Sequence, residues 1–81
     1  MTEKRWEFEL DGKKHSVELE HNTFSNKRSI RVDGRLLSLS PKVQQPKERN
    51  SKHAFRIEGH TCEILVDYKD RKFVYNFILD G

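Results

Sequence analysis

The sequence predicts an all-β protein, an antiparallel β-sandwich of about seven short strands that is rich in hairpins and has no significant helix. Three observations predict it. Apolar and polar residues alternate in short runs such as Val17-Glu18-Leu19 and Ile30-Arg31-Val32, which is the pattern of half-buried strands. Asp-Gly pairs follow several of these runs and supply the positive φ angles of tight hairpin turns. No window of about ten residues keeps apolar residues at helical spacing without Gly or Pro.

The first half of the chain predicts four strands joined by short turns. Turns are expected at Asp11-Gly12 and Asp33-Gly34, and residues 21–26 form a polar connector whose side chains can bond their own backbone. Val17 and Leu19 are expected to face inward. The four expected strands are Arg5–Leu10, His15–Glu20, Lys27–Val32 and Arg35–Leu39.

The second half predicts three more strands after a long loop. Residues 40–52 contain both prolines and one aliphatic residue, Val43, so a flexible loop is expected within a single domain that spans residues 1–81. A four-residue polar turn is expected at Tyr68–Arg71, and Cys62, Ile64 and Val66 are expected to face inward. The three expected strands are His53–Ile57, Thr61–Val66 and Lys72–Leu79.

The last strand is apolar on both faces, and Asp80-Gly81 after it has the composition of another hairpin turn. An edge strand with apolar side chains invites pairing with another chain. The sequence therefore suggests a homodimer through the edge of Phe73–Leu79.

Composition indicates a small folded domain with a thin core. Of the 81 residues, 33% are apolar and 36% are charged, whereas ordinary globular domains are about 45–50% apolar. The single cysteine, Cys62, cannot form an internal disulfide and fits a reducing compartment. Met1–Arg5 leads into a strand rather than an apolar run, and no stretch is long and apolar enough to span a membrane. These features predict a cytoplasmic protein that does not enter a membrane.

No pattern of catalytic, metal-binding or cofactor-binding residues stands out, so the chain is expected to be no enzyme and to hold no metal or cofactor. His60 and Cys62 lie two residues apart, but His15, His21 and His53 add no zinc-ligand spacing. The glycines all lie at turns, and none belongs to a phosphate-binding loop.

An alternative function is the binding of single-stranded nucleic acid. The net charge is +3, and basic residues in the long loop could join two others to form a basic patch beside aromatic residues. Those residues are Lys42, Lys47, Arg49 and Lys52, with Lys27 and Arg28. Against this reading, the aromatic residues occupy the alternating positions that a sandwich core requires, so nucleic acid is not the expected partner.

Several short motifs resemble the repeat of the Fas apoptotic inhibitory molecule family. The most specific is Glu20-His21-x-Thr23-x-Ser25-x-Lys27-Arg28, which is preceded by Trp6 and followed by Val32-Asp33-Gly34. A second run, Phe55-x-Ile57-x-x-His60-x-Cys62-x-Ile64, resembles the later part of the same repeat. The resemblance implies a non-enzymatic, intracellular β-sandwich linked to cell survival and to protection against aggregation. Animal members contain two such repeats, and this chain contains one.

The residues that carry this resemblance are the candidate partner-binding residues, and the protein partner itself is unknown. A structural reading assigns Thr23 and Ser25 to the satisfaction of backbone groups in the connector. Family members usually have Gly where this chain has Asn22 and Asn26, and Asn also tolerates positive φ, so positive φ is expected at both. The candidates are Trp6, Glu20, His21, Thr23, Ser25, Lys27, Arg28, Asp33 and Gly34.

Overall fold

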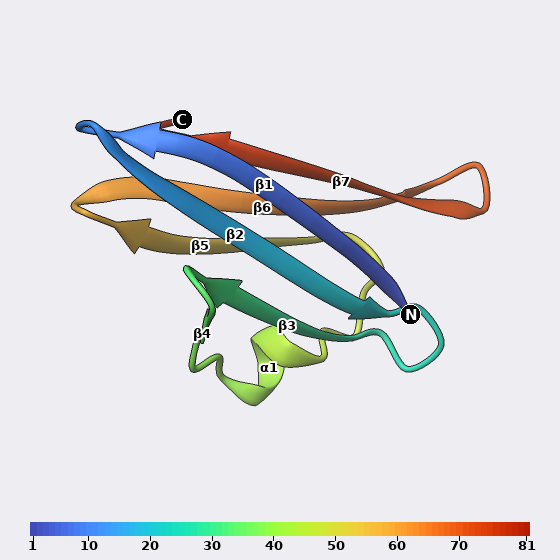
Figure 1. Cartoon of the computed structure of the whole chain (residues 1–81). Coiled ribbons are helices and arrows are strands. Elements are labelled where there is room, and N and C mark those ends of the chain that lie inside the picture. The colour runs from blue at the N-terminus through green and yellow to red at the C-terminus, as the bar shows by residue number, and fades with distance from the viewer. The chain divides into compact units, whose positions relative to one another are not determined.

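The computed structural model describes residues 1–81 as seven strands in two antiparallel sheets, with one helical turn. The prediction of an all-β fold is therefore confirmed. The chain divides into two units, Met1–Lys47 and Glu48–Gly81, and each unit carries one sheet (Figure 1). The sheet orders are β1-β2-β3-β4 and β5-β6-β7. No helix is long and apolar enough to cross a membrane. The elements are β1 (Thr2–Leu10), β2 (Lys13–Asn22), β3 (Lys27–Val32), β4 (Arg35–Leu36), α1 (Pro41–Gln44), β5 (Ser51–Ile57), β6 (His60–Lys69) and β7 (Lys72–Leu79).

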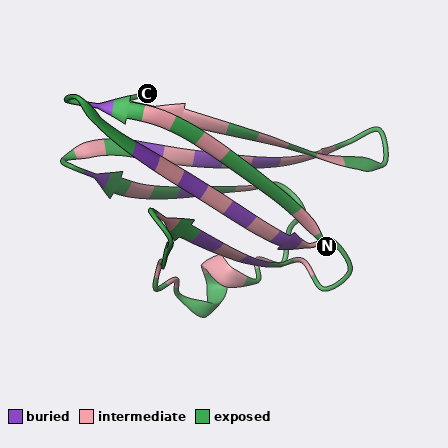
Figure 2. Cartoon of the chain, viewed as in Figure 1, coloured by how far each residue is buried: buried purple, intermediate pink, exposed green.

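The sheet of the first unit is a meander with one buried face. Asp11-Gly12 has φ angles of 52° and 81°, which allows the two-residue turn between β1 and β2. Along β2 buried residues alternate with half-buried ones, and Val17 and Leu19 are 0% and 1% exposed. The alternation is visible as stripes along the strands in Figure 2. The inward orientation expected for Val17 and Leu19 is thus confirmed.

Three strands in this unit have bounds that differ from prediction, and one of them, β2, spans Lys13–Asn22 instead of His15–Glu20. β1 begins at Thr2, so the strand includes three residues more than expected at its start. The fourth strand was predicted to reach Leu39, but β4 covers only Arg35–Leu36. Leu37 N still donates to Ile30 O at 2.8 Å, and the chain then leaves the sheet for α1.

The segment predicted as a loop over residues 40–52 contains regular structure at both ends. Pro41 is the first residue of α1, where its fixed φ suits a helix and its missing N–H costs nothing. Val43 N and Gln44 N donate to Ser40 O at 2.9 and 2.8 Å. At the other end, β5 already begins at Ser51. A single helical turn is too short to produce a periodic sequence pattern, which explains why the sequence did not reveal it.

The sheet of the second unit is a three-stranded meander whose central strand has one buried face. Cys62, Ile64 and Val66 are all 0% exposed, as expected from the sequence. The turn between β6 and β7 is shorter than predicted, because it contains only Asp70 and Arg71. Both residues have positive φ, 51° and 64°, which closes a tight hairpin at the pair Lys69 and Lys72.

The β6–β7 turn suggests a stabilising substitution. Arg71 adopts a left-handed conformation that costs a non-glycine residue about 1–2 kcal/mol, whereas Gly adopts it freely. The greater freedom of Gly in the unfolded chain offsets part of this gain. We expect Arg71→Gly to raise the free energy of unfolding by about 0.5–1 kcal/mol in urea titrations. Lys72→Gly, one residue into β7, is the control and should lower it; a lower value for Arg71→Gly would mean that the arginine side chain outweighs backbone strain.

Candidate functional site

The connector between β2 and β3 is a hydrogen-bonded turn. Asn22 Oδ1 accepts from the backbone N–H of Phe24 at 3.0 Å and from that of Ser25 at 3.2 Å. Asn26 N donates to Asn22 O at 2.7 Å. Positive φ was expected at both asparagines; it is confirmed at Asn26, with φ 64°, and wrong at Asn22. Asn22 ends β2, and its side chain rather than its backbone conformation shapes the turn.

Two buried signature residues lie beneath this turn. His21 and Arg28 face each other across β2 and β3 and are 0% and 1% exposed. Asn26 Oδ1 accepts from Arg28 Nη2 at 2.8 Å and lies 2.8 Å from His21 Nε2. Since an amide oxygen only accepts, His21 Nε2 carries a proton and donates to it. One asparagine side chain therefore binds both buried groups.

Further hydrogen bonds connect the turn to the segment after α1. Asn26 Nδ2 donates to Pro46 O at 2.9 Å, and Gln45 Nε2 donates to Ser25 O at 2.8 Å. Both partners belong to the first unit, which spans residues 1–47. The turn is thus held on one side by the strands and on the other by this segment, which limits the conformations it can adopt.

Burial of His21 makes the stability of the fold pH-dependent. Burial lowers the pKa of His21; the hydrogen bond that His21 donates to Asn26 partly opposes this, and the Arg28 charge adds to the lowering. The unfolded chain therefore binds more protons than the folded chain below the ordinary imidazole pKa of about 6.5. We expect the free energy of unfolding to fall as the pH drops below about 6.5. Urea titrations of the wild type and His21→Gln across this range would measure it, and the variant, which keeps a donor but does not titrate, should show a weaker slope. An equal slope in both would assign the dependence to other groups.

The surface of the turn displays an aromatic side chain. Phe24 is 101% exposed, and the neighbouring Thr23, Ser25 and Lys27 are exposed as well. Ser25 Oγ accepts from Lys27 N at 3.3 Å, in line with the structural role expected for Ser25. Sequence reasoning missed Phe24, although an isolated aromatic residue within a polar connector was a signal that could have identified it.

A small hollow of about 220 Å³ lies beside the turn. Its walls include the acidic Glu20 and the basic Lys27. Glu20 faces Ser29 in the strand register, whereas Lys27 faces Asn22. The signature run Glu20–Arg28 is thus split in two: His21 and Arg28 support the turn from inside, and the remaining members lie at the surface.

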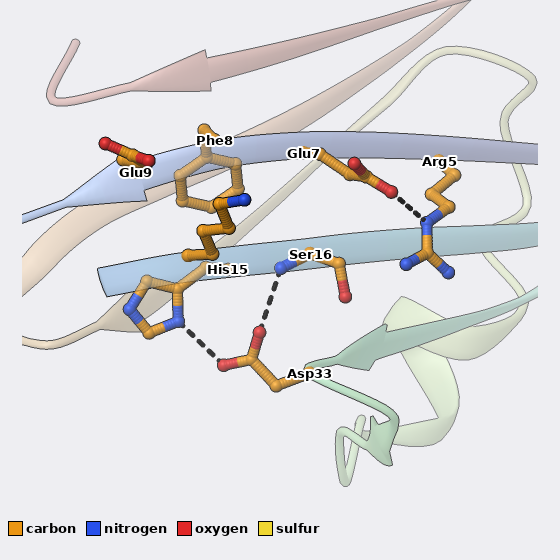
Figure 3. A pocket seen from close by; sticks show the side chains of 8 residues that line it. Arg5, Glu7, Phe8, Glu9, His15, Ser16 and Asp33 are labelled. Atoms are coloured by element: carbon orange, nitrogen blue, oxygen red, sulfur yellow. Dashed lines mark hydrogen bonds and ion pairs between the residues drawn. The ribbon is translucent and has the colours of Figure 1, made fainter. Parts of the chain in front are cut away.

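Asp33 forms a second cluster, at the far end of β3 (Figure 3). Its carboxylate accepts from His15 Nδ1 at 2.7 Å and from Ser16 N at 2.8 Å, and Asp33 N donates to Ser16 O at 2.9 Å. These bonds, first that from His15 and then that from Ser16, hold the pKa of Asp33 below its usual value. Asp33 and Gly34 have φ angles of 51° and 81°, so the predicted turn is present.

An open pocket of about 440 Å³ lies beside this cluster. Arg5 in its wall is already engaged, since Nε lies 2.9 Å from Glu7 and Nη1 lies 2.9 Å from Glu18. The His15–Asp33 pair resembles the base and orienting group of a catalytic triad. However, Nε2 of His15 is buried without a hydrogen-bond partner, so the ring presents no accessible nitrogen to a molecule in the pocket. The geometry is that of a connection between β2 and β3.

Three further residues singled out in the sequence, Trp6, Arg49 and Lys52, make other contacts. Trp6 is half-buried in β1 opposite Val17 and lines neither the hollow nor the pocket. The Arg49 guanidinium, just before β5, lies 4.4 Å from the Tyr68 ring centre, and Nζ of Lys52, in β5, lies 3.6 Å from Glu63. No three His, Cys, Asp or Glu side chains are arranged to hold a metal ion.

Comparison with known proteins gives one match. The family model described as Fas apoptotic inhibitory molecule matches residues 2–81, almost the whole chain. No curated protein and no solved structure matches. The match includes both the β2–β3 turn and the Asp33 cluster.

Proposed function

Because the chain belongs to the Fas apoptotic inhibitory molecule family, we propose that it is a non-enzymatic protein-interaction module that binds through the β2–β3 turn. The observation that carries this proposal is the full exposure of Phe24 on a turn held by side-chain hydrogen bonds. Aromatic side chains contribute much of the binding energy at protein interfaces. A turn that is already ordered loses little conformational entropy on binding.

The activity we propose for this module is protection of other proteins against aggregation, one of the two roles associated with the family, in the cytoplasm. Partly unfolded proteins expose apolar segments, and an exposed Phe24 offers an apolar contact to them. The single cysteine, Cys62, is a free thiol, which fits a reducing compartment. The family's other association, with cell survival, would follow from binding of a specific signalling protein at the same turn.

Light scattering from insulin reduced with dithiothreitol tests this activity, because the released B chain aggregates. We expect the wild-type chain in molar excess to reduce the scattering several-fold and Phe24→Ser to lose most of this effect. Phe24→Trp should retain it, because it keeps an exposed aromatic ring. Leu36→Ser is the matched control, since Leu36 is another exposed apolar residue, 59% accessible in β4, and lies outside the turn.

Each outcome bears on the proposal. Equal losses for Phe24→Ser and Leu36→Ser would indicate general stickiness rather than a site, and unchanged protection by Phe24→Ser would remove the turn as the binding surface. Absence of protection by the wild type would reject the activity. Thermal unfolding of each variant is followed by circular dichroism. An unfolding curve equal to that of the wild type would show that Phe24→Ser changes the surface of the turn and leaves the stability of the fold unchanged.

A further inference from the structure

The exposed side of β7 differs from that of the other edge strand in its sheet. β7 is the last strand of the order β5-β6-β7, and its more exposed side carries Val74, Asn76 and Ile78 between one positive and one negative residue. Val74 is 38% exposed. On the opposite edge, β5 exposes Lys52, Ala54 and Arg56. Charged residues of one sign protect an edge from pairing, and β7 lacks this protection.

The strand register determines which backbone groups of β7 point away from β6. Lys69 and Lys72 close a two-residue hairpin, and such a closing pair is hydrogen-bonded. At the other end, Asp80 N donates to Thr61 O at 2.7 Å. The backbone groups of the even-numbered residues therefore point toward β6, and those of the odd-numbered residues point outward from the sheet.

We propose that two copies of this chain pair their β7 strands antiparallel about a two-fold axis at Asn76, which joins two three-stranded sheets into one of six strands. Only the outward backbone groups of odd-numbered residues can bond to the second copy, so each odd-numbered residue of one strand must face an odd-numbered residue of the other. The numbers of any two facing residues therefore add to an even sum. With Asn76 on the axis, this sum is 152. This proposal rests on β7 and is independent of the binding role proposed for the β2–β3 turn.

This register places apolar side chains opposite apolar ones and the lysine opposite the aspartate along the strand. On the more exposed side, Val74 faces Ile78, and Lys72 faces Asp80 at both ends of the interface. On the other side, Phe73 faces Leu79 and Tyr75 faces Phe77, where aromatic and aliphatic cross-strand pairs are favourable. Asp80 is already held in place by His60 Nδ1 at 2.8 Å, and its side chain remains 52% exposed, so it can reach a partner lysine.

The neighbouring registers match less well. With Tyr75 on the axis, Lys72 faces Ile78 and Val74 faces Asn76. With Phe77 on the axis, Val74 faces Asp80 and Asn76 faces Ile78. Both place polar side chains against aliphatic ones on the more exposed side and separate the opposite charges. Charge and apolar complementarity therefore select a second copy, in one register, as the occupant of this edge.

Disulfide trapping tests the register. On the axis, the two Asn76 positions form a non-hydrogen-bonded pair with Cα atoms about 4.5 Å apart, which is within the range that a disulfide spans. We expect Asn76→Cys to form a covalent dimer under mild oxidation, seen by non-reducing electrophoresis. Val74→Cys alone should not, because two copies of position 74 would lie four residues apart along the strand, about 13 Å. A mixture of Val74→Cys and Ile78→Cys should cross-link. The wild type is a further control, since its only cysteine, Cys62, is buried.

Sedimentation equilibrium tests the association itself. We expect the wild type to show a concentration-dependent rise toward the dimer mass in the high micromolar range, and Val74→Lys to remain monomeric. Ala54→Lys adds the same charge to the exposed side of β5 and should leave dimerisation unchanged. A wild type that stays monomeric at these concentrations would overturn the proposal, and so would a dimer that resists Val74→Lys or a Cys pattern that favours position 75 or 77 over 76.

Discussion

Asn26→Ala is expected to lower the free energy of unfolding by about 3–5 kcal/mol, because it removes several contacts together. The substitution removes the acceptor shared by His21 Nε2 and Arg28 Nη2 and the donor to Pro46 O. A buried polar group that loses its partner costs about 1–3 kcal/mol. In addition, alanine must adopt the φ of 64° that asparagine tolerates. A domain of 81 residues typically has a total stability of about 4–12 kcal/mol, so the variant should be close to unfolding at room temperature.

Two further variants separate the causes. Asn26→Gly relieves the backbone strain and still loses the side-chain bonds, so it should be more stable than Asn26→Ala. Asn26→Asp keeps the acceptor for His21 and Arg28 and loses only the donor to Pro46, so it should be the least affected. Urea unfolding followed by tryptophan fluorescence measures all three, with Trp6 as the only tryptophan. A loss below about 1 kcal/mol for Asn26→Ala would show that water replaces the amide oxygen and that the turn is less rigid than we argue.

Leu19→Ala is expected to be the second largest loss, about 3 kcal/mol, because it leaves a cavity in a buried strand. Leu19 is 1% exposed and lies between Lys4 and Ile30 in the register of β1, β2 and β3. The matched control is Leu36→Ala, since Leu36 is 59% exposed and should change stability by less than about 0.5 kcal/mol. Thermal unfolding by circular dichroism would measure both, and similar values for the two would place Leu19 outside the core.

The two units of the chain use the same device to connect strands. In the first unit, Asp33 accepts from His15 Nδ1 at 2.7 Å and its N–H donates to Ser16 O. In the second, Asp80 accepts from His60 Nδ1 at 2.8 Å and its N–H donates to Thr61 O. Both aspartates have positive φ, 51° and 54°. The sequences after the histidines also correspond, His-Ser-Val-Glu-Leu against His-Thr-Cys-Glu-Ile. This likeness shows that the histidines near the starts of β2 and β6 are structural partners of aspartates with positive φ.

Several features of the fold were readable from sequence because they depend on near neighbours. Period-two alternation identified the strands and their inward residues, such as Ile64 and Val66, since side chains of a strand point alternately to its two faces. Asp-Gly pairs identified the turns, because few other pairs adopt consecutive positive φ angles so readily. The β6–β7 turn was predicted too long, because Asp70 and Arg71 adopt these angles without a glycine and only closure of the hairpin imposes them.

The candidate site was readable only in part. The motif from Glu20 to Arg28 singled out the segment that forms the β2–β3 turn, but its residue types do not by themselves predict which side chains are buried. Arg28 is a charged residue that is 1% exposed, and Phe24 is an aromatic residue that is fully exposed, which is the reverse of what hydrophobicity alone favours.

The sequence by itself determined the strand pattern, the turns and the family, because these depend on local periodicity and on contiguous motifs. Only the tertiary structure decided that Asn26 joins His21, Arg28 and Pro46, because those groups meet through strand pairing and through the return of the chain after α1. The physical reason is that the bonds of Asn26 to His21 and Arg28 depend on the pairing of β2 with β3, and its bond to Pro46 joins residues 20 apart in the sequence, so no local pattern records them.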